Sequence, residues 1–158
     1  MNTLAIGIDM VHVPSFAEQL GAPGTAFAQR TFTARELRQA ADRVVGGQDS
    51  LVPHLAVRWA GKEAVVKAWS GALFGYPPAV GVDQLDWREI EILNDRWGRP
   101  HVQLVPSLSE TLLGSLCAAG VIPSAATQIR WHLSLSHEVD YAQAQVHLSA
   151  ASTELPPR

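Results

Sequence analysis

The sequence predicts a single α+β domain, in which an antiparallel sheet packs against one long central helix. Alternating apolar and polar segments lie towards both ends of the chain, and a long apolar helix pattern occupies its middle. The 158 residues are 47% apolar and 17% charged, which suits a folded core without disulfides. We expect one domain over residues 1–150 and a flexible tail over residues 151–158.

The first strand is predicted over residues 4–13, which alternate and are rich in β-branched side chains. This pattern places Leu4, Ile6 and Ile8 on one face of the strand. We expect that face to be the core face. Asp9 would then lie on the opposite face, away from the core.

Four further strands follow from the same two-residue period and from turn residues. They are expected over residues 89–93, 101–105, 131–136 and 141–149. Gly98 and Pro100 mark the turn of a hairpin between the first two, and residues 136–140 form the loop between the last two. In the last strand, small apolar residues alternate with glutamine and histidine, which predicts one buried face.

Helix starts are predicted from Ser or Thr followed three residues later by Glu, the spacing of a capping box. The three matches are Ser15 with Glu18, Thr33 with Glu36, and Ser107 with Glu110. A glycine-rich loop over residues 44–54 precedes the longest helix, predicted over residues 55–73. This helix is apolar on most sides, so we expect close packing around it and a second subunit over its small-residue face.

The two lysines of the chain, Lys62 and Lys67, both lie on this helix and flank Glu63. Glu63 and Lys67 are four residues apart, so a simple surface ion pair is one interpretation. The alternative rests on burial, because a carboxylate and an ammonium on a covered helix need strong partners such as a metal ion or a phosphate.

Asp9 is the expected companion of Glu63, since two carboxylates form a hard-oxygen site that suits Mg²⁺ together with phosphate ligands. A structural role for Asp9 at the end of its strand is the other possibility. His137 and the 94–100 turn are weaker candidates, because a single histidine and a turn are most often structural.

Composition argues against several classes of function. The net charge of −3 and the absence of a basic run argue against nucleic-acid binding. Cys117 is the one cysteine and lies in an apolar segment, which favours a buried thiol. No signal-peptide pattern or membrane-spanning stretch is evident, so a cytoplasmic protein is expected.

Four motifs in order resemble the holo-[acyl-carrier-protein] synthases, the small single-domain 4′-phosphopantetheinyl transferases. These motifs are GIDMVHV, RWAGKEAVVKAW, IEILNDRWGRPHV and SLSHEVDYAQAQV, and the resemblance spans residues 4–149. The resemblance implies the fold of that family and its reaction, in which Mg²⁺ assists transfer of the phosphopantetheine arm of coenzyme A to a serine of apo-acyl carrier protein. Adenosine 3′,5′-bisphosphate is the second product, and the reaction supports fatty acid biosynthesis.

The resemblance also implies roles for particular residues. Asp9 and Glu63 would hold the metal, and Lys67 would stabilise the phosphate charge. Cofactor-binding roles would fall to Arg58, Lys62, Lys67, Gly98, Arg99, Pro100 and His137. The base that accepts the serine proton remains open between a metal-bound water, Glu63 and Asp9.

The implied partners are an acyl carrier protein and two further copies of the chain, in a homotrimer with shared active sites. The sequence departs from the family in having no Lys or Arg between Asp9 and Arg30, where relatives often carry basic residues that meet the carrier. A carrier domain within a larger synthase is therefore a second possible partner. A metal-dependent phosphohydrolase and a non-catalytic coenzyme A-binding trimer are the competing functions.

Overall fold

The structure is a computed structural model and describes residues 2–44, 50–124 and 127–151. Each predicted strand is present, and one short helix and two 3₁₀ turns lie outside the sequence predictions. The elements are β1 (Asn2–His12), α1 (Val13–Gly21), α2 (Phe27–Thr31), α3 (Ala34–Ala41), α4 (Leu51–Ala72), η1 (Val82–Gln84), η2 (Trp87–Glu89), β2 (Ile90–Asn94), β3 (Pro100–Leu104), α5 (Pro106–Ala118), β4 (Gln128–Glu138) and β5 (Tyr141–Ala151).

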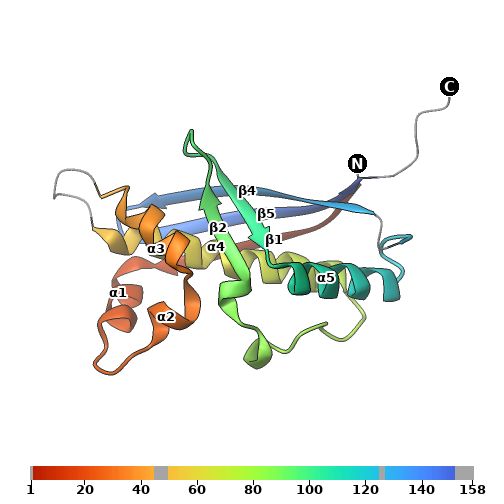
Figure 1. The fold of residues 1–158 in the computed structure, drawn as a ribbon, viewed down its shortest axis with the longest axis horizontal. Helices are drawn as coiled ribbons and strands as arrows, with labels where there is room; N and C mark the ends of the chain where they lie inside the picture. The colour runs from red at the N-terminus through yellow and green to blue at the C-terminus, as the bar shows by residue number, and fades with distance from the viewer. Residues whose placement is uncertain (1, 45–49, 125–126, 152–158) are drawn as a thin grey trace.

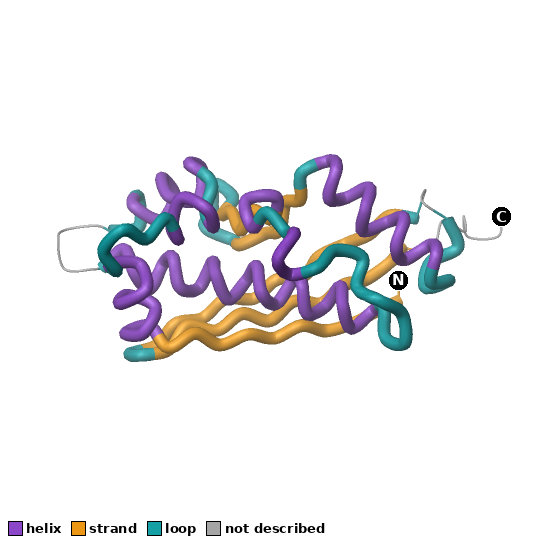
Figure 2. The backbone as a smooth tube through the Cα atoms, turned by 90° about the horizontal axis from the view of Figure 1, so that it is seen from below, coloured by secondary structure: helices purple, strands orange, loops and turns teal. Residues whose placement is uncertain are grey.

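The larger sheet has the strand order β1-β5-β4, and both of its strand pairs are antiparallel. α4 runs along one face of this sheet, chiefly against β1 and β5 (Figure 1). Figure 2 shows the strands of this sheet along one side of the molecule, with α4 next to them. β2 and β3 form a separate antiparallel hairpin. The predicted α+β class with a long central helix is confirmed.

The predicted orientation of β1 is wrong. Asp9 pairs with the buried Ala144 of β5, so its side chain shares the face that α4 covers. Ile6, Ile8 and Met10 lie on the other face and are 54%, 52% and 63% exposed. The alternation was read correctly, but it did not identify which face the helix covers.

Gly7 explains why this face of β1 meets α4. A Cβ atom at Gly7 would lie 1.9 Å from the backbone oxygen of Ala64, so only glycine allows the strand and the helix to approach this closely. On the predicted small-residue face of α4, Ala64 and Ala68 are fully buried against β1, and Gly61 lies against Ile92 of β2. This face is therefore covered by elements of the same chain, and the prediction that another subunit covers it is wrong.

Helices are present near all of the predicted helix positions, but only one of the three predicted capping boxes is present. The Thr33–Glu36 capping box is present at the start of α3. α1 and α5 instead begin with a proline in the first turn and lack the predicted side-chain caps. α4 begins at Leu51, four residues before the predicted start, because Ser50 caps it and Pro53 is tolerated in its first turn.

The hairpin turn matches its prediction. Gly98 has a φ of 84°, and the Asp95 carboxylate accepts hydrogen bonds from the backbone N–H groups of Trp97 and Arg99. The predicted loop between the last two strands is shorter than expected, since β4 continues to Glu138. His137 is consequently a strand residue near the end of β4.

Two sequence predictions fall outside the described residues: the flexible tail beyond residue 151 and the centre of the loop before α4 at residues 45–49. Within the described part of the chain, no helix has the length and apolar character needed to cross a membrane.

Candidate active site

Asp9, Glu63 and Lys67 come together where β1 crosses α4. The Lys67 Nζ atom donates a hydrogen bond of 2.7 Å to Asp9 Oδ1. Glu63 lies one helical turn before Lys67, on the same flank of α4. The Lys67 side chain is 50% exposed and that of Asp9 is 15% exposed, so solvent or a substrate reaches this pair.

The electrostatics of Glu63 suit a cation site. Burial raises the pKa of the Glu63 carboxyl, the neighbouring Asp9 carboxylate raises it further, and the Lys67 ammonium lowers it. A divalent cation between the two carboxylates would remove their mutual repulsion. No group of three or more potential His, Cys, Asp or Glu ligands occurs among the described residues. Two carboxylates fit Mg²⁺, which commonly takes its other ligands from water and substrate phosphates.

A second part of the site is a pocket of about 190 Å³ beside the first half of α4. Four of the predicted cofactor-binding residues line it: Arg58, Gly98, Pro100 and His137. They come from α4, the β2–β3 hairpin and β4, three segments that are far apart in the sequence. The structure therefore brings most of the predicted cofactor set into one pocket. Arg43, His54 and Asn94 complete its polar lining.

Arg58 is the main cation of this pocket and is only 3% exposed. Its Nη1 donates to the His54 backbone oxygen at 2.7 Å, and its Nη2 donates to Asn94 Oδ1 at 3.0 Å. Its Nε is buried without a hydrogen-bond partner. Burial lowers the pKa of Arg58, Glu36 opposes this effect, and Arg43 adds to it. A buried guanidinium with an unsatisfied nitrogen favours binding of an anion.

The Arg99 side chain lies outside this pocket. It is bonded to Asp95 across the hairpin turn, with 2.7 Å between Arg99 Nε and Asp95 Oδ2. The Trp97 ring lies against the guanidinium groups of both Arg96 and Arg99, at 3.8 and 4.6 Å from its centroid. Trp97 and Arg96 border an adjoining hollow of about 430 Å³, which shares Arg43, Asn94 and Gly98 with the pocket.

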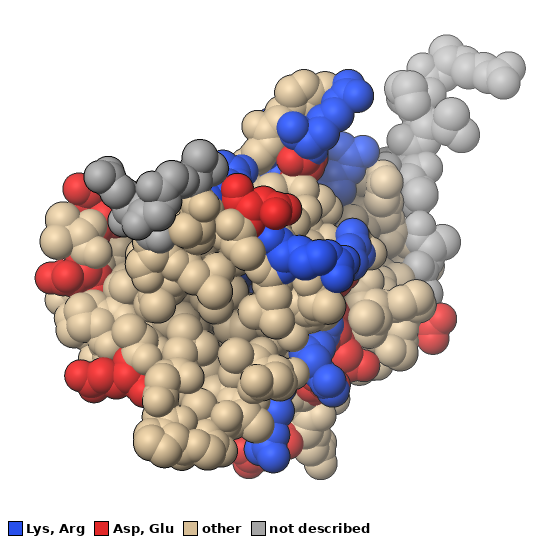
Figure 3. Space-filling view, turned by 60° about the vertical axis from the view of Figure 1, so that its left-hand side comes forward, with Lys and Arg blue, Asp and Glu red and all other residues tan. Residues whose placement is uncertain are grey.

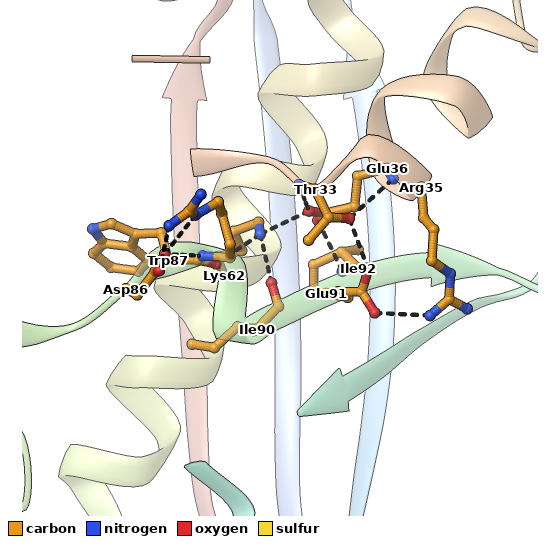
Figure 4. Close-up of polar contacts among 10 residues, drawn as sticks. Thr33, Arg35, Glu36, Lys62, Asp86, Trp87, Ile90, Glu91 and Ile92 are labelled. Atoms are coloured by element: carbon orange, nitrogen blue, oxygen red, sulfur yellow. Dashed lines mark hydrogen bonds and ion pairs between the residues drawn. The ribbon is translucent and has the colours of Figure 1, made fainter. Parts of the chain in front are cut away.

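Lys62 occupies a position that its predicted cofactor-binding role does not fit. Its side chain is 0% exposed, and its Nζ donates to Glu36 Oε2 at 2.9 Å and to the backbone oxygens of Trp87 and Ile90 (Figure 4). All three hydrogens of the ammonium are therefore used inside the fold. We correct the assignment of Lys62 from cofactor binding to a structural ion pair.

Sequence reasoning missed Arg43, His54 and Asn94. His54 lies one turn before Arg58 on the same helix, and its ring contacts the His137 ring with 5.4 Å between centroids. Spacing on the helix could have indicated His54, and the NDRWGRP motif already contained Asn94. Arg43 follows α3 and carries no such signal, because its place beside Gly98 depends on the tertiary fold.

In the view of Figure 3, lysine and arginine side chains run from the top of the molecule to its lower edge. Acidic side chains lie at the left margin and also beside these basic side chains. Several of the arginines are paired with carboxylates, including Arg35 with Glu91 and Arg99 with Asp95.

Comparisons with known proteins give the class of protein to which this fold and site correspond. The model of the 4′-phosphopantetheinyl transferase superfamily matches residues 5–146. A holo-[acyl-carrier-protein] synthase of Mycobacterium tuberculosis is 42% identical over 150 residues, which cover 95% of this chain and 99% of the relative. One of Corynebacterium glutamicum is 40% identical over 141 residues, covering 89% and 94%.

Solved structures agree with these relatives. An acyl carrier protein synthase of Chronobacterium ammoniagenes in complex with coenzyme A is 39% identical, with a TM-score of 0.77, and the match covers 94% of this chain and 98% of that one. The synthase of Mycobacterium tuberculosis is 36% identical, with a TM-score of 0.66 and coverage of 95% and 100%. The chain belongs to the holo-[acyl-carrier-protein] synthase family of the 4′-phosphopantetheinyl transferase superfamily.

Proposed function

We propose that this protein transfers the phosphopantetheine arm of coenzyme A to a serine hydroxyl of an apo-acyl carrier protein. In this reaction the serine oxygen bonds to the phosphorus that bears the arm, the pyrophosphate bond breaks, and adenosine 3′,5′-bisphosphate leaves. The observation that carries the proposal is that α4 contributes both to a pocket and to a cluster of two carboxylates and a lysine. The arginine-lined pocket suits a phosphate-rich ligand, and the Asp9, Glu63 and Lys67 cluster beside the same helix suits phosphoryl chemistry.

Asp9 and Glu63 are the residues that would hold Mg²⁺. When bound, the ion would polarise phosphoryl oxygens and neutralise negative charge on the pyrophosphate. Burial raises the pKa of Glu63 and the neighbouring Asp9 carboxylate raises it further. A cation held by both carboxylates would relieve this repulsion, which supports the assignment.

The side chains of this protein have separable tasks in the proposed reaction. Arg58 binds a phosphate of coenzyme A in the pocket, which His137 also lines. Lys67 is half exposed and makes one ion pair among the described residues, so its ammonium can turn from Asp9 to the phosphate charge that develops during transfer. The acceptor of the serine proton stays open between Glu63, Asp9 and a water held by the metal ion.

We further propose that two more copies of the chain cover the open face of the large sheet, giving a homotrimer. Three exposed apolar side chains in a row, Ile6, Ile8 and Met10, support an interface there. They pair across the sheet with polar residues of β5, so the face offers both apolar area and hydrogen-bonding groups. Sedimentation should give three times the monomer mass, whereas a stable active monomer would contradict this assembly.

The proposed partner is an acyl carrier protein or a carrier domain of a larger synthase. α1 contains an exposed glutamate, Glu18, and no Lys or Arg, so its docking to an acidic carrier would not rest on cations of that helix. Either a free acyl carrier protein or a carrier domain of a larger synthase fits this surface. Participation in fatty acid biosynthesis and a cytoplasmic location stay predictions from the sequence.

The proposed function is tested by incubating the protein with coenzyme A, Mg²⁺ and an apo-carrier protein, and weighing the carrier. A mass increase of one phosphopantetheine arm is expected. Asp9→Ala and Glu63→Ala should each abolish the increase while the protein stays folded. Glu110→Ala is the matched control, since it removes an exposed carboxylate of α5 far along the sequence from both.

Other outcomes would identify the competing functions. Cleavage of coenzyme A without any change in the carrier would indicate a phosphohydrolase. Binding of coenzyme A with no reaction under any of these conditions would indicate a non-catalytic binding protein.

A further inference from the structure

Asn94 is the last residue of β2, and its side chain connects two walls of the arginine-lined pocket. Its Oδ1 accepts the 3.0 Å hydrogen bond from Arg58 Nη2 on α4. Its Nδ2 donates a hydrogen bond of 2.9 Å to the backbone oxygen of Gly98 in the hairpin turn. Together with the His54 backbone oxygen, which accepts from Arg58 Nη1, this amide fixes the direction of the Arg58 guanidinium, and it also holds the turn beside it.

The backbone of Asn94 is itself held by a side chain. Gln39 of α3 donates from Nε2 to the Asn94 backbone oxygen at 3.0 Å, and its Oε1 accepts from the Asn94 backbone N–H at 2.8 Å. The two bonds repeat the pattern by which a neighbouring strand pairs with a β-strand. Gln39 thus completes the edge of β2 that faces away from β3.

Glu36 makes a single bond to β2 one turn earlier on α3, where its Oε1 accepts from the Ile92 backbone N–H at 3.0 Å (Figure 4). Glu36 also binds the buried Lys62 of α4. Side chains of α3 thus bond to the edge of β2 that does not pair with β3, where a neighbouring strand would otherwise pair. Through the Glu36–Lys62 ion pair, α3 also links this edge to α4. Gln39 continues the contact to the end of β2 that faces the pocket.

The chemical type of residue 94 matters as well as its position. An amide oxygen orients a guanidinium without adding negative charge, whereas a carboxylate would neutralise much of its attraction for an anion. In the part of the chain that the structure describes, the pocket lining contains Arg43, Arg58 and two histidines and no Asp or Glu. Asn94 therefore holds Arg58 without adding a negative charge to the pocket lining.

We infer that Asn94 is a positioning residue for coenzyme A: it orients Arg58 toward the phosphate it binds, and Gln39 locks Asn94 in place. This inference rests on the proposed function only for the identity of the ligand. Asn94 need not touch coenzyme A, because it acts through Arg58.

A double-mutant cycle tests the inference, with the affinity of the full chain for coenzyme A measured by titration calorimetry without carrier protein. Asn94→Ala should weaken binding about 10-fold, the scale of one hydrogen bond to a charged group. In an Arg58→Met background the same change should alter affinity by less than about 2-fold, since the group it orients is gone. Equal losses in both backgrounds would overturn the inference, because they indicate a general structural effect.

Three further variants guard against misreading a folding defect. Gln39→Met removes the amide at similar volume and should weaken binding in the same direction as Asn94→Ala, by a smaller factor. Asn94→Asp keeps the acceptor for Arg58 and should still weaken binding, because it adds a negative charge; tighter binding by this variant would overturn the inference. Arg35→Gln breaks a half-exposed ion pair to Glu91 on the same junction of α3 and β2 and should leave affinity unchanged.

The result is distinguishable from that of the proposed function. If the wild-type chain binds coenzyme A and the cycle shows coupling, but the carrier gains no arm, the proposed function is wrong and the positioning role stands. If the carrier is modified and the cycle shows no coupling, only the positioning role is wrong. A wild-type chain that does not bind coenzyme A would overturn both.

Discussion

Lys62 and Lys67 are five residues apart on α4, and each makes an ion pair, yet their surroundings differ completely. The Lys62–Glu36 pair is 0% exposed on both sides, and its ammonium has three acceptors within the fold. The Lys67–Asp9 pair is partly open, and the Lys67 ammonium has one acceptor among the described residues. Both lysines lie close to a carboxylate, so proximity to charge does not distinguish their roles. The number of acceptors that the ammonium group has within the fold does: Lys62 has three, and Lys67 has one among the described residues and can also contact a substrate.

The largest effect is expected from Lys62→Ala, which leaves the Glu36 carboxylate buried without its cation. Breaking a buried pair in this way destabilises a protein by about 3–5 kcal/mol. For a chain of this size the melting temperature should fall by about 10 °C. This fall in melting temperature is measured by thermal unfolding followed by circular dichroism.

A companion variant distinguishes charge from packing. Lys62→Met combined with Glu36→Gln removes both charges at similar volume and should recover much of the lost stability. If Lys62→Ala stays as stable as wild type and instead raises the KM for coenzyme A, our reassignment of Lys62 is wrong and its original cofactor-binding prediction is right.

Lys67→Ala is the opposite case, with the effect expected in catalysis. Removal of one preorganised electrostatic group lowers kcat by about 10²–10³-fold, while a partly exposed ion pair contributes about 0–1 kcal/mol to folding. Steady-state kinetics and a thermal melt on the same sample separate the two. Lys67→Arg, which keeps the charge, should retain more activity than the alanine variant, and equal rates for both would argue against an electrostatic role.

The smallest effect concerns Glu63, whose folded-state pKa lies above its unfolded value because burial disfavours its charge. Below the unfolded pKa of about 4.3 the carboxyl is protonated in both states and contributes no penalty. Above the raised folded pKa it is ionised in both states, and folding is less favourable. Glu63→Gln should therefore raise the melting temperature at neutral pH by ~1–3 °C, and the gain should vanish as the pH falls to about 4.

Magnesium sharpens this prediction. If Glu63 and Asp9 hold the ion, Mg²⁺ should raise the melting temperature of wild type more than that of Glu63→Gln. An identical response of the two proteins would place the metal elsewhere.

Periodicity predicted most of the fold because strands and helices are local patterns. It could not show which face of β1 meets the helix, since the apolar row Ile6, Ile8 and Met10 faces outward and a glycine marks the inner face. The Thr33–Glu36 capping box was predictable because both its partners lie within one turn. The ion pair between Glu36 and Lys62 was not predictable, because the two residues are 26 positions apart in the sequence.

The candidate site likewise contains residues that the sequence pattern indicated and residues whose contacts depend on the tertiary fold. Asp9, Glu63 and Lys67 were predicted to come together, and the structure places them so, because a covered helix with isolated charges limits the partners available to each. Arg58 was predicted as a cofactor contact, but the means by which it is oriented were not. Those depend on Asn94 and Gln39, whose contacts cross from α3 to β2 to α4 and leave no periodic trace in the sequence.

Gly7 carries no functional group, but it determines the distance between β1 and α4, and therefore the distance between Asp9 and the Glu63 and Lys67 side chains. Because its missing Cβ would collide with the backbone of α4, any side chain at position 7 pushes strand and helix apart by more than an ångström and carries Asp9 away from Glu63 and Lys67 with it. In a saturation-mutagenesis screen for activity, position 7 will therefore score with the chemically active positions. A screen that records only loss of activity would therefore classify Gly7 as a catalytic residue, although its role is to allow close packing of β1 and α4.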